Sequence, residues 1–236
     1  EALERAMSYA RQSGNHRVEI QVGGWLVVTF ELLPIAADAA IARAERLLQL
    51  ANGEPWAEAD ILMPLSVIYA YAGRFADARE AIARARSVYD RPAAKVRWAM
   101  GASVAGRIEL VAGDPAAAGH HLREAYEAFR AMGERGFLSS VAGWLAEALH
   151  AQGRLDEAQQ MTGEAQAAAS PADIDAQALW RAARAKVLAR SGQFSAAHIL
   201  LDEAEALVSP TSWAALQAHI LKARAEVDRL AGAPQR

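Results

Sequence analysis

The stretch LHAQGRLDEA, residues 149–158, lacks the residue spacing of a catalytic or ligand-binding site, yet its pattern recurs elsewhere in the chain. The segments YAYAGRFADA at 69–78 and ELVAGDPAAA at 109–118 share its plan: a largely apolar run, a glycine, and an alanine five residues after the glycine. Glycine ends helices well, because it tolerates the left-handed conformation that follows the last helical turn. Each stretch therefore predicts a tight turn between two helices.

These turns recur with a fixed period. Five glycines that each follow a helical apolar run, here called the marker glycines, are spaced by 40, 40, 39 and 40 residues. A period of this size indicates stacked supersecondary units. The first four are followed by alanine at five and at twelve residues, and all five are preceded by a small residue at seven. The marker glycines are Gly73, Gly113, Gly153, Gly192 and Gly232, the alanines Ala78, Ala118, Ala158, Ala197, Ala85, Ala125, Ala165 and Ala204, and the preceding residues Ser66, Gly106, Ala146, Ala185 and Ala225.

The small residues are expected to allow close packing of two helices, because antiparallel helices joined by a tight turn approach closely only where side chains are short. Asp114 and Pro115 are expected to cap and begin the helix after Gly113. We expect Ser170-Pro171 and Ser209-Pro210 to begin later helices in the same way. Between the predicted turns, apolar residues recur with the period of a helix, and no stretch shows the alternation of apolar and polar residues that is typical of a strand.

The predicted fold is therefore an all-α, right-handed superhelical solenoid of antiparallel helix pairs, with repeats of about 40 residues. Because no linker interrupts the pattern, we expect one domain over residues 1–236. The chain begins with Glu inside a helical pattern, which suggests a fragment of a larger protein. The expected helices are 2–13, 15–33, 35–51, 55–72, 75–89, 92–112, 115–132, 134–152, 155–169, 172–191, 194–208 and 211–231.

The repeat pattern in residues 65–85 and 145–165 resembles the tetratricopeptide repeat (TPR), although its period exceeds the usual length. The longer helices resemble TPR-like arrays in bacterial regulators of the MalT type. Residues 109–158 and 173–194 are similar to the C-terminal regions of bacterial adenylate/guanylate cyclases and related ATPase regulators. The resemblance implies a non-catalytic repeat region of a bacterial regulatory protein.

Composition narrows the possible functions. The 236 residues carry a net charge of −3 without a basic tract, so direct nucleic-acid binding is not expected. Without cysteine there is no disulfide and no Cys-ligated metal. The longest apolar run, residues 22–30, is about half of a membrane span. We expect a soluble, cytoplasmic protein.

The sequence offers no catalytic constellation, and we expect neither enzymatic activity nor a cofactor. Adjacent His120 and His121 point about 100° apart on a helix, which does not favour a metal pair. The carboxylates of Asp156-Glu157 and Asp202-Glu203 have no nucleophile or metal cluster beside them in the sequence. The six tryptophans share no repeat position, so they are expected to wedge between helices or, alternatively, to anchor a peptide.

The positions that face inward in a TPR-like array give a candidate groove. Arg107, Glu147, Lys186 and Glu226 precede marker glycines by six residues and are expected in one row. A second row holds Tyr71, Val111, Ala151, Arg190 and Leu230. The rows are either a binding surface or a ladder of ion pairs that keeps the repeats in register. The candidate groove residues are Met63, Tyr71, Arg107, Glu147, His150, Lys186, Arg190, Lys222, Glu226 and Arg229.

Two functions fit this surface. The first is a scaffold or sensor module that binds a protein or peptide partner in the groove. The second is a regulatory domain that binds a small-molecule effector, which a closed apolar pocket lined by Trp and Met would favour.

Overall fold

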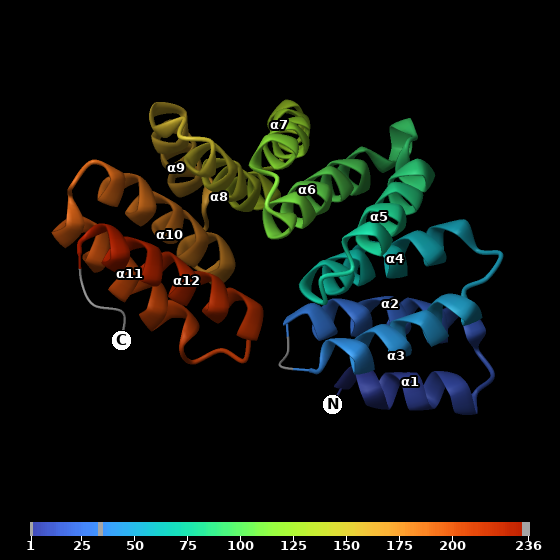
Figure 1. The fold of residues 1–236 in the computed structure, drawn as a ribbon. Coiled ribbons are helices and arrows are strands. Elements are labelled where there is room, and N and C mark those ends of the chain that lie inside the picture. The colour runs from blue at the N-terminus through green and yellow to red at the C-terminus, as the bar shows by residue number, and fades with distance from the viewer. Residues whose placement is uncertain (1, 33–34, 233–236) are drawn as a thin grey trace. The chain divides into compact units, whose positions relative to one another are not determined.

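The computed structural model describes residues 2–32 and 35–232. Within these ranges there are twelve α-helices, one 3₁₀ turn and no strand, so the predicted fold class, an all-α array of antiparallel helix pairs, is confirmed (Figure 1). The predicted end of the second helix at residue 33 lies outside the described residues. The helices are α1 (Ala2–Gln12), α2 (His16–Leu32), α3 (Ala37–Leu50), α4 (Pro55–Tyr71), α5 (Phe75–Tyr89), α6 (Lys95–Ala112), α7 (Pro115–Met132), α8 (Arg135–Ala151), α9 (Leu155–Ala168), α10 (Ile174–Arg190), α11 (Phe194–Val208) and α12 (Ala214–Leu230).

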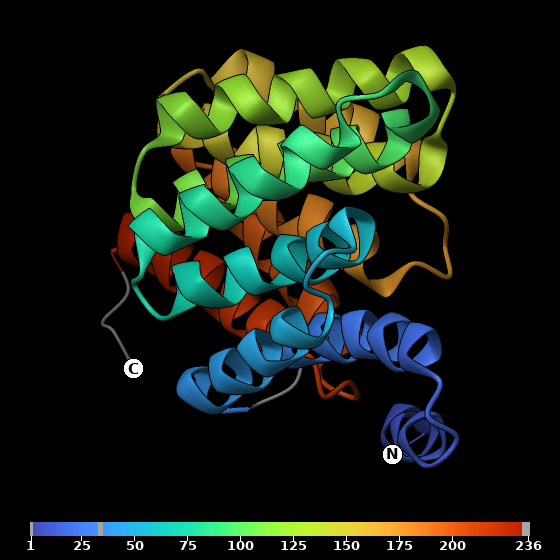
Figure 2. The same ribbon diagram turned by 90° about the vertical axis from the view of Figure 1, so that its right-hand side faces the viewer.

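The helices gather into two compact units, Glu1–Ala112 and Gly113–Arg236, here called unit 1 and unit 2. In unit 1, α4 packs against α5 in a hairpin, cyan to green in Figures 1 and 2, and also against α2 and α6. In unit 2, the hairpins α8–α9 and α10–α11 stack so that α10 contacts both α8 and α12. Each unit thus brings alternate helices of the chain side by side. The expectation of one continuous domain and of a right-handed winding stays a prediction.

The marker glycines end helices as expected. All five have positive φ angles, between 74° and 84°. After α8, the amide of Gly153 donates to the carbonyl of His150, and the amide of Arg154 donates to that of Leu149, each over 2.9 Å. This pair of bonds is the Schellman motif, which satisfies carbonyls at the end of a helix.

The small residues lie where the helices meet. The alanines five and twelve residues after the marker glycines are all fully buried, and Ser66, Ala146 and Ala185 before them are buried as well. Ala225 is the exception and is exposed, because no described helix packs on that face of α12. Two helices also approach closely at Gly143, where an added Cβ would lie 2.9 Å from Cγ of Leu179 on α10.

Two of the predicted caps are wrong. Asp114 does cap α7 by accepting a hydrogen bond from the amide of Ala117. Ser170-Pro171, however, lies in a turn, and Asp173 caps α10 by accepting from the amide of Ala176. Ser209 follows the end of α11 rather than starting α12, which begins at Ala214. A Ser-Pro pair fits a turn as well as a helix start, and here the nearby aspartate is the better cap for α10.

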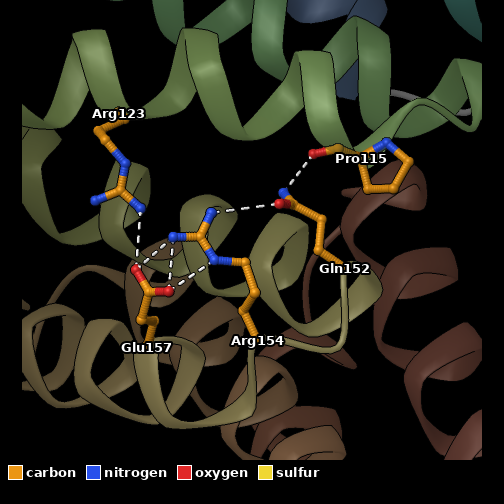
Figure 3. Close-up of polar contacts among 5 residues, drawn as sticks. All are labelled: Pro115, Arg123, Gln152, Arg154 and Glu157. Atoms are coloured by element: carbon orange, nitrogen blue, oxygen red, sulfur yellow. Dashed lines mark hydrogen bonds and ion pairs between the residues drawn. The ribbon is translucent and has the colours of Figure 1, made fainter.

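A polar network ties α7 to the α8–α9 turn (Figure 3). The amide of Gln152 donates to the carbonyl of Pro115 over 2.7 Å. Arg154 donates two hydrogen bonds of 2.7 Å to Glu157, which Arg123 approaches to 3.4 Å. Because these charged groups are about half exposed, each ion pair stabilises the fold by about 1 kcal/mol at most, and the network chiefly fixes the register of α7.

The described helices include none with the length and apolar character required to cross a membrane.

Candidate functional site

Three of the predicted inner-row residues meet in unit 2. Glu147 on α8 forms an ion pair with Lys186 on α10, and Lys186 lies 3.6 Å from Glu226 on α12. These residues share a repeat position, and the stacking of α8, α10 and α12 aligns them as predicted. Glu147 is only 5% exposed, and the Lys186 side chain 11%.

Two histidines extend the row into a cluster, here called the inner cluster: Glu147, His150, Lys186, His219 and Glu226. Nε2 of His219 lies 3.5 Å from Oε1 of Glu147, and Nε2 of His150 lies 3.8 Å from Oε1 of Glu226. Three of these atoms are buried without a hydrogen-bond partner among the described residues: Oε1 of Glu147, Nε2 of His150 and Nε2 of His219. The cluster therefore links α8 to α12 directly, past the intervening α10–α11 hairpin.

Burial and neighbouring charges have opposite effects on the pKa values of Glu147 and Lys186 in this cluster. Burial alone would raise the pKa of Glu147, but the ammonium of Lys186 and the imidazole of His219 outweigh it and hold that pKa well below its usual range. Burial would lower the pKa of Lys186, yet the carboxylates of Glu147 and Glu226 raise it. Burial and the charge of Lys186 lower the pKa of His150. Near neutral pH the cluster therefore holds an ionised Glu147, a charged Lys186 and a neutral His150.

The burial corrects part of the groove prediction. Glu147 and His150 were expected on an open surface, but they are 5% and 3% exposed because α10 and α12 close over them. Glu147 and Lys186 thus have the geometry of the register-keeping ladder rather than that of a binding surface. The ladder was the alternative that the sequence left open.

Three other predicted residues are exposed on unit 2. Arg190 at the end of α10, and Lys222 and Arg229 on α12, are all exposed and make no ion pair with a described residue. Lys222 and Arg229 are seven residues apart, so they lie on one face of α12 about two turns apart. Glu226 lies between them on the same face and points to Lys186 and His150. The surface beside the inner cluster is therefore positively charged.

The remaining groove residues belong to unit 1. Met63 and Arg107 are half-buried, whereas Tyr71 is 46% exposed. Val111, which shares its repeat position with Tyr71, is 43% exposed. This position is exposed on α4, α6, α8 and α10, whereas Leu230, the member of the predicted row on α12, is half-buried. The place of Arg107 in a row with residues of unit 2 stays a prediction.

One group of side chains in the described residues has the donors for a metal ion. His120, His121 and Glu124 bring their ligand atoms within 4.8 Å of one another. Glu124 stands between the two histidines around the helix axis, one turn further on, which the adjacent-histidine argument overlooked. All three donors come from a single turn of α7, and the His120 side chain is 72% exposed. The three donors lie on one solvent-exposed side of α7, so they do not surround a metal ion.

His219 and Trp144 are the residues of this region that sequence reasoning missed. The His219 ring packs edge-on against Trp144, with 4.8 Å between centroids. His219 lies thirteen residues before its marker glycine and Glu147 six before its own, so the repeat register does not pair them. They meet because α10 packs against both α8 and α12. Of the other tryptophans, Trp180 is buried between helices, but Trp25 and Trp56 are 62% and 40% exposed.

Solved structures of helical repeat proteins share this fold. BtubC (BKLC) from P. vanneervenii is 18% identical, with a TM-score of 0.65 over 89% of each chain. Aspartyl phosphate phosphatase F from Bacillus subtilis is 13% identical, with a TM-score of 0.67 over 95% of this chain and 59% of its own. The TPR-like repeats of a kinesin light chain from Podospora anserina are 15% identical, with a TM-score of 0.53 over 87% of this chain and 93% of their own. The chain therefore has the fold of TPR-like repeat proteins.

No protein-family model matches the sequence, and no curated protein matches it significantly. At the identities found among solved structures, the similarity shows the fold alone.

Proposed function

We propose that this chain is a non-catalytic, TPR-like interaction module of a cytoplasmic bacterial signalling or regulatory protein, and that unit 2 binds an acidic segment of a protein or peptide partner. TPR-like folds serve many functions, so the proposal rests on the surface and not on the fold. The surface is formed by Arg190, Lys222 and Arg229 on α10 and α12, here called the cationic surface. The regulatory setting follows from the sequence resemblance of residues 109–158 to cyclase and ATPase regulators.

The unpaired state of these three cations carries the proposal. Several other arginines of the described chain are held by carboxylates: Arg79 binds Glu109 through two hydrogen bonds, and Arg224 donates to Asp202 and Glu205. Arg190, Lys222 and Arg229 have no such partner among the described residues although the chain has net negative charge. A surface of one sign attracts a partner of the opposite sign and raises its rate of association.

The same geometry makes a small-molecule effector the weaker alternative. Such a ligand needs an enclosed, mostly apolar pocket. Between α8, α10 and α12 lie the charged and imidazole groups of the inner cluster and the ring of Trp144, which do not form an apolar lining. One hollow of about 700 Å³ lies at the α1–α2 turn, where it is open and lined by residues such as Tyr9, Asn15 and Val18.

The test uses two labelled probes, a short peptide of alternating Glu and Ala and its Lys–Ala counterpart. Fluorescence anisotropy should show binding of the acidic peptide alone, weakened by salt because exposed charges are screened. Arg190→Glu and Arg229→Glu should each weaken binding about tenfold, a loss of about 1.4 kcal/mol. Arg17→Glu, which reverses an exposed cation of unit 1, serves as the control and should bind like the unaltered chain. Equal binding of both peptides, or no effect of the reversals, would rule out the cationic surface.

A further inference from the structure

The first helices of the hairpins in unit 2 share one face, here called the stacking face, that receives the first helix of the next hairpin. It is formed by the residues three, seven, ten and fourteen positions before each marker glycine, a spacing that places them on one side of a helix. On α8 and α10 all of these residues are buried, because α10 packs on α8 and α12 packs on α10. They are Ser139, Gly143, Ala146 and His150 on α8, and Ala178, Ala182, Ala185 and Ala189 on α10.

On α12 the stacking face is open. Leu221, which lies at its edge, is 58% exposed. The opposite face of α12 is buried against α10 and α11 by an apolar stripe that includes Leu216, Ile220 and Val227. A helix with apolar residues on two opposite faces is typical of one that is covered on both. The four members of the stacking face of α12, all of them exposed, are Ala218, Lys222, Ala225 and Arg229.

The small residues of this open face match those that admit a helix on α10. Ala178 and Ala185 of α10 are fully buried and belong to the apolar core that α10 shares with α12. Ala218 and Ala225 hold the same two repeat positions on α12. Because short side chains let two helix backbones approach closely, α12 keeps the surface on which a further helix can pack.

The charge of the open face says what such a helix must carry. Lys222 and Arg229 stand where α10 has Ala182 and Ala189, and neither cation forms an ion pair with a described residue. A helix packed on this face removes water from both cations, which is unfavourable unless carboxylates pair with them. A second copy of this chain would add the same two cations, and like charges repel. The surface therefore fits an acidic helix of another protein.

We propose that an amphipathic, acidic helix of a partner protein packs on the stacking face of α12. Its apolar stripe covers Ala218, Leu221 and Ala225, and its carboxylates pair with Lys222 and Arg229. The partner helix thereby continues the stack of α8, α10 and α12 by one element. This inference rests on the proposed function, since the two share these cations, and it adds that the acidic segment is a helix with an apolar face.

Two labelled peptides of 17 residues, the length of α12, separate the apolar stripe from the charge. Both contain the same numbers of Leu, Ala and Glu, which favour a helix. The stripe peptide places its leucines on one helical face, with the spacing of Leu216, Ile220, Ala223 and Val227. The scrambled peptide distributes them around the helix. Fluorescence anisotropy should show the stripe peptide binding at least about tenfold more tightly than the scrambled one.

Variants then assign the binding to α12. Ala225→Phe blocks the close approach of a helix and should weaken the stripe peptide about tenfold, with little effect on the scrambled peptide. Ala225 is exposed, so thermal melting should be unchanged. Ala206→Phe is the matched control, because Ala206 is an exposed alanine of α11, and it should bind like the unaltered chain. Lys222→Glu should weaken both peptides.

The outcomes distinguish the docked helix from the proposed function. Equal binding of the two peptides, weakened by Lys222→Glu but not by Ala225→Phe, would overturn the docked helix and leave the cationic surface intact. Failure of both peptides to bind would overturn both proposals. Sedimentation velocity of the chain alone should show no self-association through this face. A dimer that Ala225→Phe dissociates would identify a second copy as the occupant and so contradict a partner helix.

Discussion

Glu147 on α8 and His219 on α12 lie 3.5 Å apart, although the α10–α11 hairpin separates their helices along the chain. The contact joins two helices that a simple stack would keep apart. It adds a histidine to the row of repeat-related charges, which together form the buried inner cluster. The exposed cations beside this cluster, Arg190, Lys222 and Arg229, form the surface that we propose binds a partner.

Removing one charge of the buried Glu147–Lys186 ion pair should destabilise the fold more than removing both charges. Lys186→Met leaves Glu147 buried without its cation, which should lower the free energy of unfolding by about 3–5 kcal/mol. The double variant Lys186→Met/Glu147→Gln removes both charges and should lose less than Lys186→Met alone. Urea unfolding of the two single variants and the double variant measures this coupling. Strict additivity would mean that the pair does not act as a unit.

Stability should fall in two steps as pH is lowered. The pKa of His150 is lowered in the folded chain, so its contribution is lost as pH falls through the unfolded value of 6.5. The pKa of Glu147 is also lowered, and the stability that it contributes is lost as pH falls below the unfolded value of 4.5. Chemical denaturation across this range should show His150→Gln without the first step and Glu147→Gln without the second. Identical profiles for all three chains would refute this assignment.

Two glycines of the same hairpin should respond oppositely to alanine. Gly153 has a φ of 75°, so Gly153→Ala strains the backbone and should cost about 1–2 kcal/mol. Gly163 lies inside α9, where an added Cβ meets only Arg184, at 3.8 Å. Gly163→Ala should therefore stabilise the fold by about 0.5–1 kcal/mol. Thermal melts of both variants provide the comparison, and a stabilising Gly153→Ala would contradict the helix-ending role of that glycine.

The repeat register makes a further prediction at Ala146, which is fully buried in α8. Ala146→Leu adds volume where helices meet and should cost about 1–3 kcal/mol through overpacking. Ala146→Gly should cost about 1 kcal/mol through its lower helix propensity. Urea melts in which leucine is tolerated better than glycine would show that this position is not a close contact.

Features encoded locally were predictable from the sequence. A marker glycine and the alanines after it specify a turn and a close contact within one hairpin, which is why the helices and their buried small residues agree with the structure. The row of Glu147, Lys186 and Glu226 was predictable because the three residues share one repeat position.

Features that depend on how helices cross were not predictable. His219 joins the cluster from a different repeat position, and the burial of Glu147 and His150 depends on the side chains that α10 and α12 place against α8. The repeat period does not specify which side chains of α12 meet those of α8. The cap of α10 was missed for a local reason, because Asp173 competes with Ser170 three residues earlier.

The most direct test of the central claim separates binding from stability on the same helices. Arg229→Glu and Lys186→Glu both reverse a cation, but the first lies on the exposed cationic surface and the second in the buried ladder. Each variant is measured twice, by anisotropy with the Glu–Ala peptide and by urea unfolding. Arg229→Glu should weaken binding about tenfold and change the free energy of unfolding by less than about 0.5 kcal/mol. Lys186→Glu should lower stability by several times that amount. An Arg229→Glu chain that binds the peptide unchanged, or that loses stability as Lys186→Glu does, would contradict the assignment of this surface to a partner.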